Sequence, residues 1–365
     1  MQVSFSRLQL IFLLLLSLGI SNHVLIIPHL LQEAGRDAWV SILAAYVILI
    51  GWSFFLYLIL KSMGITPFNS WLEAKGGKIG YWIIVSGLTL YLLVAGTMII
   101  FDTVKNINIF FLPSTPNAVI IFSFIILSFG AARSGLKTLI YLSVLLLPIV
   151  WILGIGVSFM TVKSKDYSML YPLFTEGFTP DLRGIVIVFG GSIDLMILLL
   201  LQHKLKKPLN YGTVAILLTL LAGLIMGPTI GSITAFGPFQ AANMRFPAFE
   251  QWRLVMIGNH ISHVDFLAAF QLMAGSVMRT ALIIFLAAEL IGYRMQKYKQ
   301  AIMVVATLIM ALPSIMQLSD IRAQKIIHSY FYGYSFWFGV MITAALLVIA
   351  YFPRKKADIA NENFT

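Results

Sequence analysis

Two short runs of glycine and polar residues interrupt apolar segments, and their residue types suit the binding of a small molecule. The first run lies within residues 8–31 and the second within residues 184–201. The candidate ligand-binding residues of the two runs are Gly19, Ser21, Asn22, His23, Gly190, Gly191, Ser192 and Asp194. Adjacent glycines cost about 1 kcal/mol each in helix propensity, and unpaired backbone at membrane depth is tolerated only where it lines a cavity or contacts a ligand. We therefore predict two unwound points that face each other across a pocket. The alternative is a pair of kinked helices whose polar residues satisfy their neighbours.

Two opposite charges lie inside apolar segments and could act with these runs. Arg279 sits near the middle of residues 265–291, and Asp194 is the other unambiguous charge at that depth. A buried guanidinium costs roughly 3 kcal/mol or more and nearly always has a partner. The two charges either form a structural ion pair or flank a ligand, with Arg279 facing a carboxylate and Asp194 an ammonium. Ser276 and Thr280, the polar neighbours of Arg279, complete the candidate ligand-binding set.

Other polar residues give weaker signals. His23 could couple the first run to protons, because histidine titrates near neutral pH, or it could be a hydrogen-bonded structural residue. His260 and His263 lack the further ligands of a zinc site, so no metal site is predicted. Asp102 and Lys105 are spaced to pair across one helical turn. The sequence contains no cysteine and no catalytic motif that we could identify, and we expect neither an enzyme nor a cofactor.

The elements that must position these residues are membrane helices. Of the 365 residues 59% are hydrophobic and 11% charged, and the mean hydropathy is +0.92, which predicts an all-α integral membrane protein. Ten apolar segments are long enough to span a bilayer. They are residues 8–31, 38–60, 79–101, 117–129, 138–160, 184–201, 212–236, 265–291, 301–318 and 329–352. Because the second interrupted span comes five spans after the first, we predict one transmembrane domain in a five-plus-five inverted repeat, with repeats at about 7–160 and 183–352 and with helices 1 and 6 broken.

The net charge of +11 is distributed in a way that favours a membrane surface over nucleic acid. If the amino terminus is cytoplasmic and ten spans alternate, fifteen lysines and arginines fall on the inner side and nine on the outer. The positive-inside rule then places both termini in the cytoplasm, with residues 353–365 as a tail. The basic inner face predicts anionic lipid as a partner.

Three motifs resemble one known family along essentially the whole chain. They are Ile26-Ile27-Pro28 leading to Ala34-Gly35-Arg36-Asp37-Ala38-Trp39-Val40-Ser41, Tyr171-Pro172-Leu173-Phe174 with Gly177 and Pro180, and Phe246-Pro247-Ala248-Phe249-Glu250 leading to Asp265. In these the chain resembles the B subunits of bacterial spore-germination nutrient receptors. That family belongs to the amino acid–polyamine–organocation transporter superfamily, whose five-plus-five, LeuT-like fold matches the two predicted interruptions.

The resemblance implies a nutrient sensor in the inner membrane of the endospore that acts with an A subunit and a lipoprotein C subunit. It also implies that a small germinant, such as an amino acid, sugar or nucleoside, binds among the first, third, sixth and eighth helices. The sequence departs from the family at Ser21, Asn22 and His23, where members often carry glycines, and at His263, where they usually carry arginine. The alternative function is a proton-coupled amino-acid transporter that works alone.

Overall fold

Long apolar runs form the helices of the computed structural model, which describes residues 4–20, 24–175, 177–256 and 264–352. Within these ranges the only β pairing is one isolated bridge between Phe5 and Leu205. The first half of the chain forms α1 (Arg7–Ile20), α2 (Ile26–Ala34), α3 (Ala38–Met63), α4 (Phe68–Phe110), α5 (Asn117–Arg133) and α6 (Leu136–Met160). The second half forms α7 (Thr179–Ser192), α8 (Ile197–Leu201), α9 (Tyr211–Phe236), α12 (Phe266–Gly292), α13 (Lys299–Ile315) and α15 (Tyr332–Tyr351). The three short helices are α10 (Pro238–Asn243), α11 (Pro247–Arg253) and α14 (Asp320–Ile326).

The helices confirm an all-α membrane architecture. Over the described ranges, eight helical segments are long and apolar enough to cross a membrane, and α1 and α5 are two shorter apolar helices. The segment Ile26–Met63 joins α2 to α3, whereas the sequence analysis assigned α2 to the first span and α3 to the second. The count of ten spans and the bounds of the two repeats stay predictions.

The predicted interruption of the first span falls on residues that the structure describes only in part. Helix α1 ends at Ile20, and α2 begins at Ile26 after a short π-type turn at Val24 and Leu25. Ser21, Asn22 and His23 lie outside the described residues, as do His260, His263 and the tail 353–365.

The sixth span changes its winding but stays helical. The α conformation of α7 continues through Ser192, the chain tightens to a 3-10 helix over η5 (Ile193–Met196), and α8 follows at once. The predicted unwinding at Gly190 and Gly191 is therefore wrong in position and in degree. The interruption lies after Ser192, in the turn that carries Asp194.

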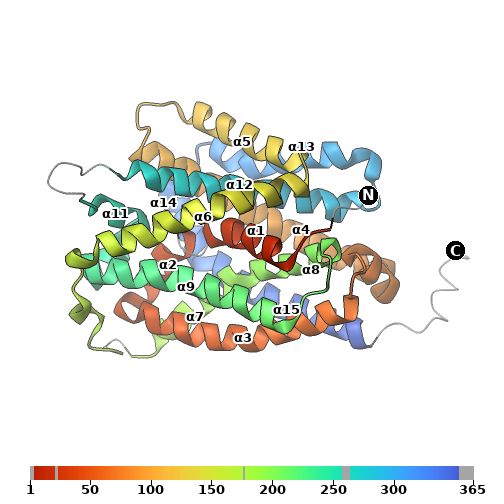
Figure 1. Ribbon diagram of the computed structural model, residues 1–365, viewed down its shortest axis with the longest axis horizontal. Helices are drawn as coiled ribbons and strands as arrows, with labels where there is room; N and C mark the ends of the chain where they lie inside the picture. The colour runs from red at the N-terminus through yellow and green to blue at the C-terminus, as the bar shows by residue number, and fades with distance from the viewer. Residues whose placement is uncertain (1–3, 21–23, 176, 257–263, 353–365) are drawn as a thin grey trace, which may run out of the picture.

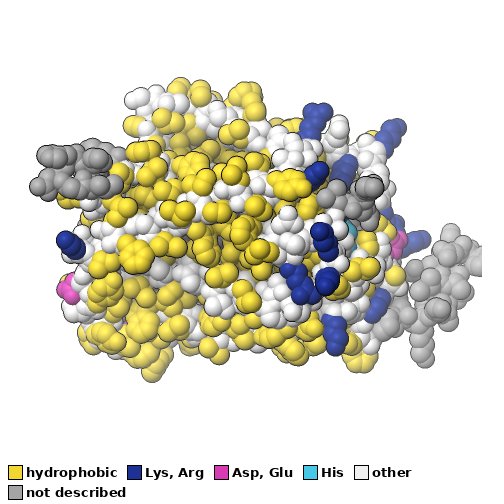
Figure 2. All heavy atoms as spheres, viewed as in Figure 1, with side chains coloured by type: hydrophobic (Ala, Val, Ile, Leu, Met, Phe, Trp, Pro, Cys, Tyr) yellow, Lys and Arg dark blue, Asp and Glu magenta, His cyan; other side chains and the backbone are white. Residues whose placement is uncertain are grey.

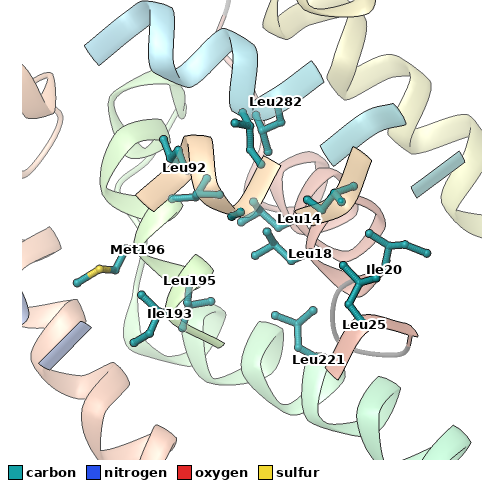
Figure 3. Packing of buried hydrophobic residues seen from close by; sticks show 14 of the residues in the cluster. Leu14, Leu18, Ile20, Leu25, Leu92, Ile193, Leu195, Met196, Leu221 and Leu282 are labelled. Atoms are coloured by element: carbon teal, nitrogen blue, oxygen red, sulfur yellow. The ribbon is translucent and has the colours of Figure 1, made fainter. Parts of the chain in front are cut away.

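The interrupted spans and α12 are central in the bundle. In the most apolar stretch of each segment, 83% of the residues of Thr179–Lys204 and 78% of α12 are buried, but only 22% of α6. Buried side chains of α1, α4, α9 and α12 converge on those around η5 (Figure 3). A site built on these elements is therefore enclosed by protein, and the surrounding helices present apolar side chains outward (Figure 2).

The bundle has two ends, which we name from Figure 1. The terminal end holds the amino terminus, and the loop end, opposite to it, holds α11. The amino-terminal segment is fixed at the terminal end, because the amide of Phe5 donates to the carbonyl of Lys204 at 3.0 Å and that of Lys206 donates to Phe5 at 2.9 Å. These bonds join the start of α1 to the chain that follows α8.

Candidate functional site

Asp194 and Arg279 meet in the middle of the bundle. Asp194 lies on η5 and Arg279 on α12, and Nη2 of Arg279 donates to Oδ2 of Asp194. Only 5% of the Asp194 side chain and 4% of the Arg279 side chain are exposed. The hydroxyl of Tyr91, on α4, donates to the other carboxylate oxygen, Oδ1, at 2.8 Å. Both oxygens of the buried carboxylate therefore have a hydrogen-bond donor.

The guanidinium of Arg279 is only partly satisfied. Its Nε and Nη1 atoms are buried and have no hydrogen-bond partner in the part of the chain that the structure describes. An unpartnered buried N–H on a charged group is costly, because the group has lost its water. Arg279 therefore retains unused capacity for an acceptor such as a carboxylate, a carbonyl or a water molecule.

A small cavity adjoins the ion pair. Its volume is about 20 Å³, which is enough for about one water molecule. Its lining is mainly apolar and aromatic, and comes from the two interrupted spans, α4, α12 and the start of α15. The lining residues are Leu25, Ile26, Tyr91, Ala95, Met98, Ile99, Gly191, Asp194, Arg279, Phe331 and Tyr332. In this closed form the pocket is therefore too small for an amino acid.

Close packing explains the glycines of the sixth span. A Cβ atom on Gly190 would lie 2.2 Å from the backbone oxygen of Tyr332, and one on Gly191 would lie 2.3 Å from Cδ1 of Ile26. These glycines let α7 approach α2 and α15 more closely than any larger residue would allow. They shape the site through packing, since the backbone is not unwound there.

The structure brings three of the predicted site residues to the cavity, namely Gly191, Asp194 and Arg279. Ser192 donates to the carbonyl of Val188 at 2.7 Å within its own helix, and Ser276 accepts from Thr103 at 2.8 Å.

Gly190, Gly19 and Thr280 do not line this cavity. Gly19 packs towards Leu224, whose Cδ1 would lie 3.1 Å from an added Cβ. Thr280 is fully buried, and its hydroxyl has no partner over the described ranges.

The sequence analysis missed two tyrosines that shape the site. Tyr91 contacts Asp194 directly, and Tyr332 donates to the carbonyl of Leu25 at 3.1 Å, beside the interruption of the first span. Tyr91 could have been found, because it is a polar residue inside the third span and the family resemblance already placed that span at the site. The role of Tyr332 depends on tertiary contacts with α2, and no sequence signal indicates it.

A second charged cluster closes the loop end. Arg245 pairs with Asp102 of α4 and, at 3.1 Å, with Asp320 of α14, and Gln324 donates to Asp102 at 2.9 Å. The predicted pairing of Asp102 with Lys105 is wrong, because the ammonium of Lys105 lies over the ring of Phe101 instead. Burial acts to lower the pKa of Arg245, but the two carboxylates outweigh it and raise that pKa above its usual range. The cluster joins three segments that are far apart in the sequence.

Hydrogen bonds also hold the terminal end together. The amide of Gln202 donates to the carbonyl of Leu60 at 2.7 Å and to that of Gly64 at 2.6 Å, and its oxygen accepts from the amide of Leu209 at 3.3 Å. The central cavity therefore lies between two cross-linked ends. Over the described ranges, no group of three or more His, Cys, Asp or Glu residues is arranged to hold a metal ion.

Known proteins resemble the chain along most of its length. A family model described as spore germination protein matches residues 4–322. Spore germination protein XB of Bacillus anthracis is 35% identical over 312 residues, which cover 86% of this chain and 88% of that protein. YfkT of Bacillus subtilis (strain 168), a provisionally named spore germination protein, is 29% identical over 240 residues, 66% of each chain.

One solved structure shows the fold. Mhp1, a nucleobase-cation-symport-1 family transporter in a closed conformation with bromovinylhydantoin bound, matches with a TM-score of 0.57 at 12% sequence identity. The match covers 100% of this chain and 97% of that one. The predicted LeuT-like architecture is thereby confirmed.

Proposed function

We propose, from the premise that this chain belongs to the spore germination protein family, that it is the membrane subunit of a nutrient-germinant receptor. In this role it binds a small germinant, such as an amino acid, in the central cavity and triggers germination. The chain is a multi-pass membrane protein whose family and fold are those of permeases and transporters rather than enzymes.

The observation that carries this proposal is the unused hydrogen-bonding capacity of Arg279. The carboxylate of Asp194 already has donors on both oxygens, whereas two N–H groups of Arg279 have no described partner. The pair could be a structural ion pair or could flank a ligand, and we propose that it does both. Asp194 and Arg279 hold the helices together, and the N–H groups of Arg279 that have no described partner donate to an acceptor on the ligand. A germinant carboxylate suits this position, because arginine binds carboxylates in a planar, charge-assisted geometry.

Binding of a germinant then requires the cavity to enlarge. A cavity of about 20 Å³ excludes an amino acid, so ligand must favour a second, more open packing of the same helices. A difference of a few kcal/mol between two packings is enough for a ligand to shift the population. This change in population between two packings is sufficient for a receptor with a transporter fold to report that its ligand is bound.

The proposed setting follows from the family and the charge distribution. We place the protein in the inner membrane of the spore with both termini on the core side, in contact with anionic lipid. Its proposed partners are a receptor A subunit and a lipoprotein C subunit.

The test replaces both charges together with neutral amides. Spores that carry Asp194→Asn with Arg279→Gln are expected to lose the response to carboxylate-bearing germinants in a ligand panel, while the variant protein still reaches the membrane. Germination is scored by loss of refractility, and protein level by immunoblotting. An unchanged dose–response curve would show that the pair does not take part in ligand binding.

The second candidate function is a stand-alone proton-coupled amino-acid transporter, which the likeness to a symporter favours. Uptake of the same ligands into vesicles that contain this chain alone separates the two. Accumulation driven by a proton gradient supports the transporter. Germination that needs a coexpressed A and C subunit, without uptake, supports the receptor.

A further inference from the structure

A groove on the side of the bundle, away from the central site, is much larger than the central cavity. Its volume is about 360 Å³, against about 20 Å³ for the central cavity. This volume lies within the roughly 300–1,000 Å³ typical of ligand pockets. Helices α6 and α9 form its walls, α12 contributes to one side, and Leu15, Leu16 and Ile20 of α1 form its floor.

The groove favours an apolar occupant. Its lining contains three side chains with hydrogen-bonding groups apart from the ring N–H of Trp151, namely Ser158, Thr219 and Gln271. Each of them already donates to a backbone carbonyl of α6 or α9, at 3.1 Å, 2.8 Å and 3.3 Å respectively. These three donors are therefore already used within the protein, and most of the remaining lining is apolar.

The groove is open to the bilayer because α9 carries glycines there, which have no side chain to fill it. A Cβ atom on Gly223 or Gly227 would have nothing within 4 Å. Figure 1 shows α1 between α6 and α9, and the same face in Figure 2 is covered with hydrophobic side chains. Ile155, on the groove wall, is 52% exposed. The groove is thus continuous with the surface that contacts lipid.

The side chain of Lys165 lies at the loop end of this groove. The ammonium of Lys165 donates to the carbonyl of Ser158 at 3.3 Å, and Ser158 lines the groove. Burial lowers the pKa of Lys165. Within the described ranges no carboxylate forms an ion pair with Lys165, and the carboxylate of the adjacent Asp166 accepts from the amide and hydroxyl of Ser168 at 2.9 Å and 2.7 Å.

We propose that the groove binds one anionic phospholipid, with an acyl chain lying on α1 between α6 and α9 and the phosphate group at Lys165. The apolar trough supplies the binding surface for the chain, and the unpaired ammonium at its end supplies charge complementarity for the head group. Because the floor of the groove is the half-helix that precedes the interruption of the first span, the lipid packs against an element of the central site.

The experiment uses the full chain in nanodiscs of zwitterionic phosphatidylcholine with a minor fraction of phosphatidylglycerol. Each lipid in turn carries a photoactivatable diazirine in its acyl chain, and labelled peptides are identified by mass spectrometry. Phosphatidylglycerol is expected to label peptides that contain residues 147–158 and 219–228, in preference to phosphatidylcholine.

Two variants test the two halves of the site. Lys165→Gln should reduce phosphatidylglycerol labelling of the groove about fivefold, which corresponds to the roughly 1 kcal/mol that one lysine near a membrane contributes. Gly223→Leu with Gly227→Leu should reduce labelling at least tenfold by filling the groove. The controls are Lys163→Gln, which changes the neighbouring lysine, and Gly51→Leu, which adds a side chain in open space on α3.

Three results would overturn the proposal. They are labelling spread evenly over the exposed helices, equal labelling by both lipids with no effect of Lys165→Gln, and displacement of phosphatidylglycerol by free fatty acid at equal concentration. Lys165 lies in the loop after α6, outside the helices, so Lys165→Gln keeps the test decisive if the double leucine variant fails to fold.

Discussion

Breaking the central ion pair one partner at a time should destabilise the protein unequally. In Asp194→Asn the guanidinium of Arg279 loses its only described anionic partner and stays buried and charged, because arginine does not release its proton in proteins. In Arg279→Gln the carboxylate of Asp194 keeps the hydrogen bond from the hydroxyl of Tyr91, so a charge-assisted contact to the buried anion remains. The aspartate change should therefore be the more damaging.

The expected magnitudes follow from the burial of both groups. Removing one partner of a buried pair costs roughly 3–5 kcal/mol, and we expect about 4 kcal/mol for Asp194→Asn and about 2 kcal/mol for Arg279→Gln. The double variant leaves no buried charge, and its two amides can bond to each other. We expect it to cost no more than about 3 kcal/mol, which gives a coupling free energy of at least about 3 kcal/mol.

The assay is reversible unfolding of the purified protein in mixed micelles, with the unfolding free energy of the four proteins compared in a double-mutant cycle. A matched control is Ser86→Ala, whose hydroxyl donates to the carbonyl of Ile83 within its own helix and lies on the exposed side of α4. Additive losses, to within about 0.5 kcal/mol, would refute the reasoning. So would a greater loss for Arg279→Gln than for Asp194→Asn, since the assignment of donors around the carboxylate would then be wrong.

Three further changes test the packing and polar contacts around the site. Tyr91→Phe should cost roughly 1.5–3 kcal/mol by removing a hydrogen bond to a charged group, and an unchanged unfolding free energy would contradict that bond. Gly190→Ala should lower the melting temperature, because the added methyl group would overlap the backbone of Tyr332. Gly223→Ala should stabilise the protein by up to about 1 kcal/mol, because alanine has the higher helix propensity and no described atom lies near the added methyl group. If both variants raised or both lowered the melting temperature, the close packing at Gly190 would be contradicted. Arg245→Met should cost about 3 kcal/mol by leaving Asp102 buried without its cation, and adding Asp102→Asn should restore part of it; no rescue would rule out the pairing.

The sequence predicted the class, the fold and the central charges because these depend on the membrane. A bilayer makes an unpaired charge so costly that two isolated charges of opposite sign in apolar segments must be expected to meet. Asp194 and Arg279 do so, although 85 residues separate them. The π-type turn at Val24 and Leu25 could be expected for a similar reason, since a polar run in a span that is otherwise apolar disfavours regular α-helix.

The glycines of the sixth span show what sequence could not decide. A glycine pair can mark unwound backbone or a close helix contact, and both reduce intrinsic helix stability by the same amount. The choice depends on what lies opposite, and here Tyr332 and Ile26 approach so closely that a Cβ atom would overlap them. The prediction for Asp102 was wrong for a related reason. Its partner Arg245 lies 143 residues away, and Lys105 is the only lysine or arginine within one helical turn of Asp102.

The central ion pair joins elements that must separate if the cavity is to enlarge. Asp194 belongs to the sixth span, which packs on α2 through Gly191, whereas Arg279 and Tyr91 belong to α12 and α4, which pack on each other. Any movement of the interrupted spans away from α4 and α12 therefore stretches the contacts of Asp194 with both residues. A ligand carboxylate bound to Nε and Nη1 of Arg279 offsets part of that loss, because it gives the guanidinium a second anion while the first moves away. A ligand that carries an amine but no acceptor cannot do this. The ion pair that holds these helices together therefore makes opening of the cavity depend on the chemistry of the ligand.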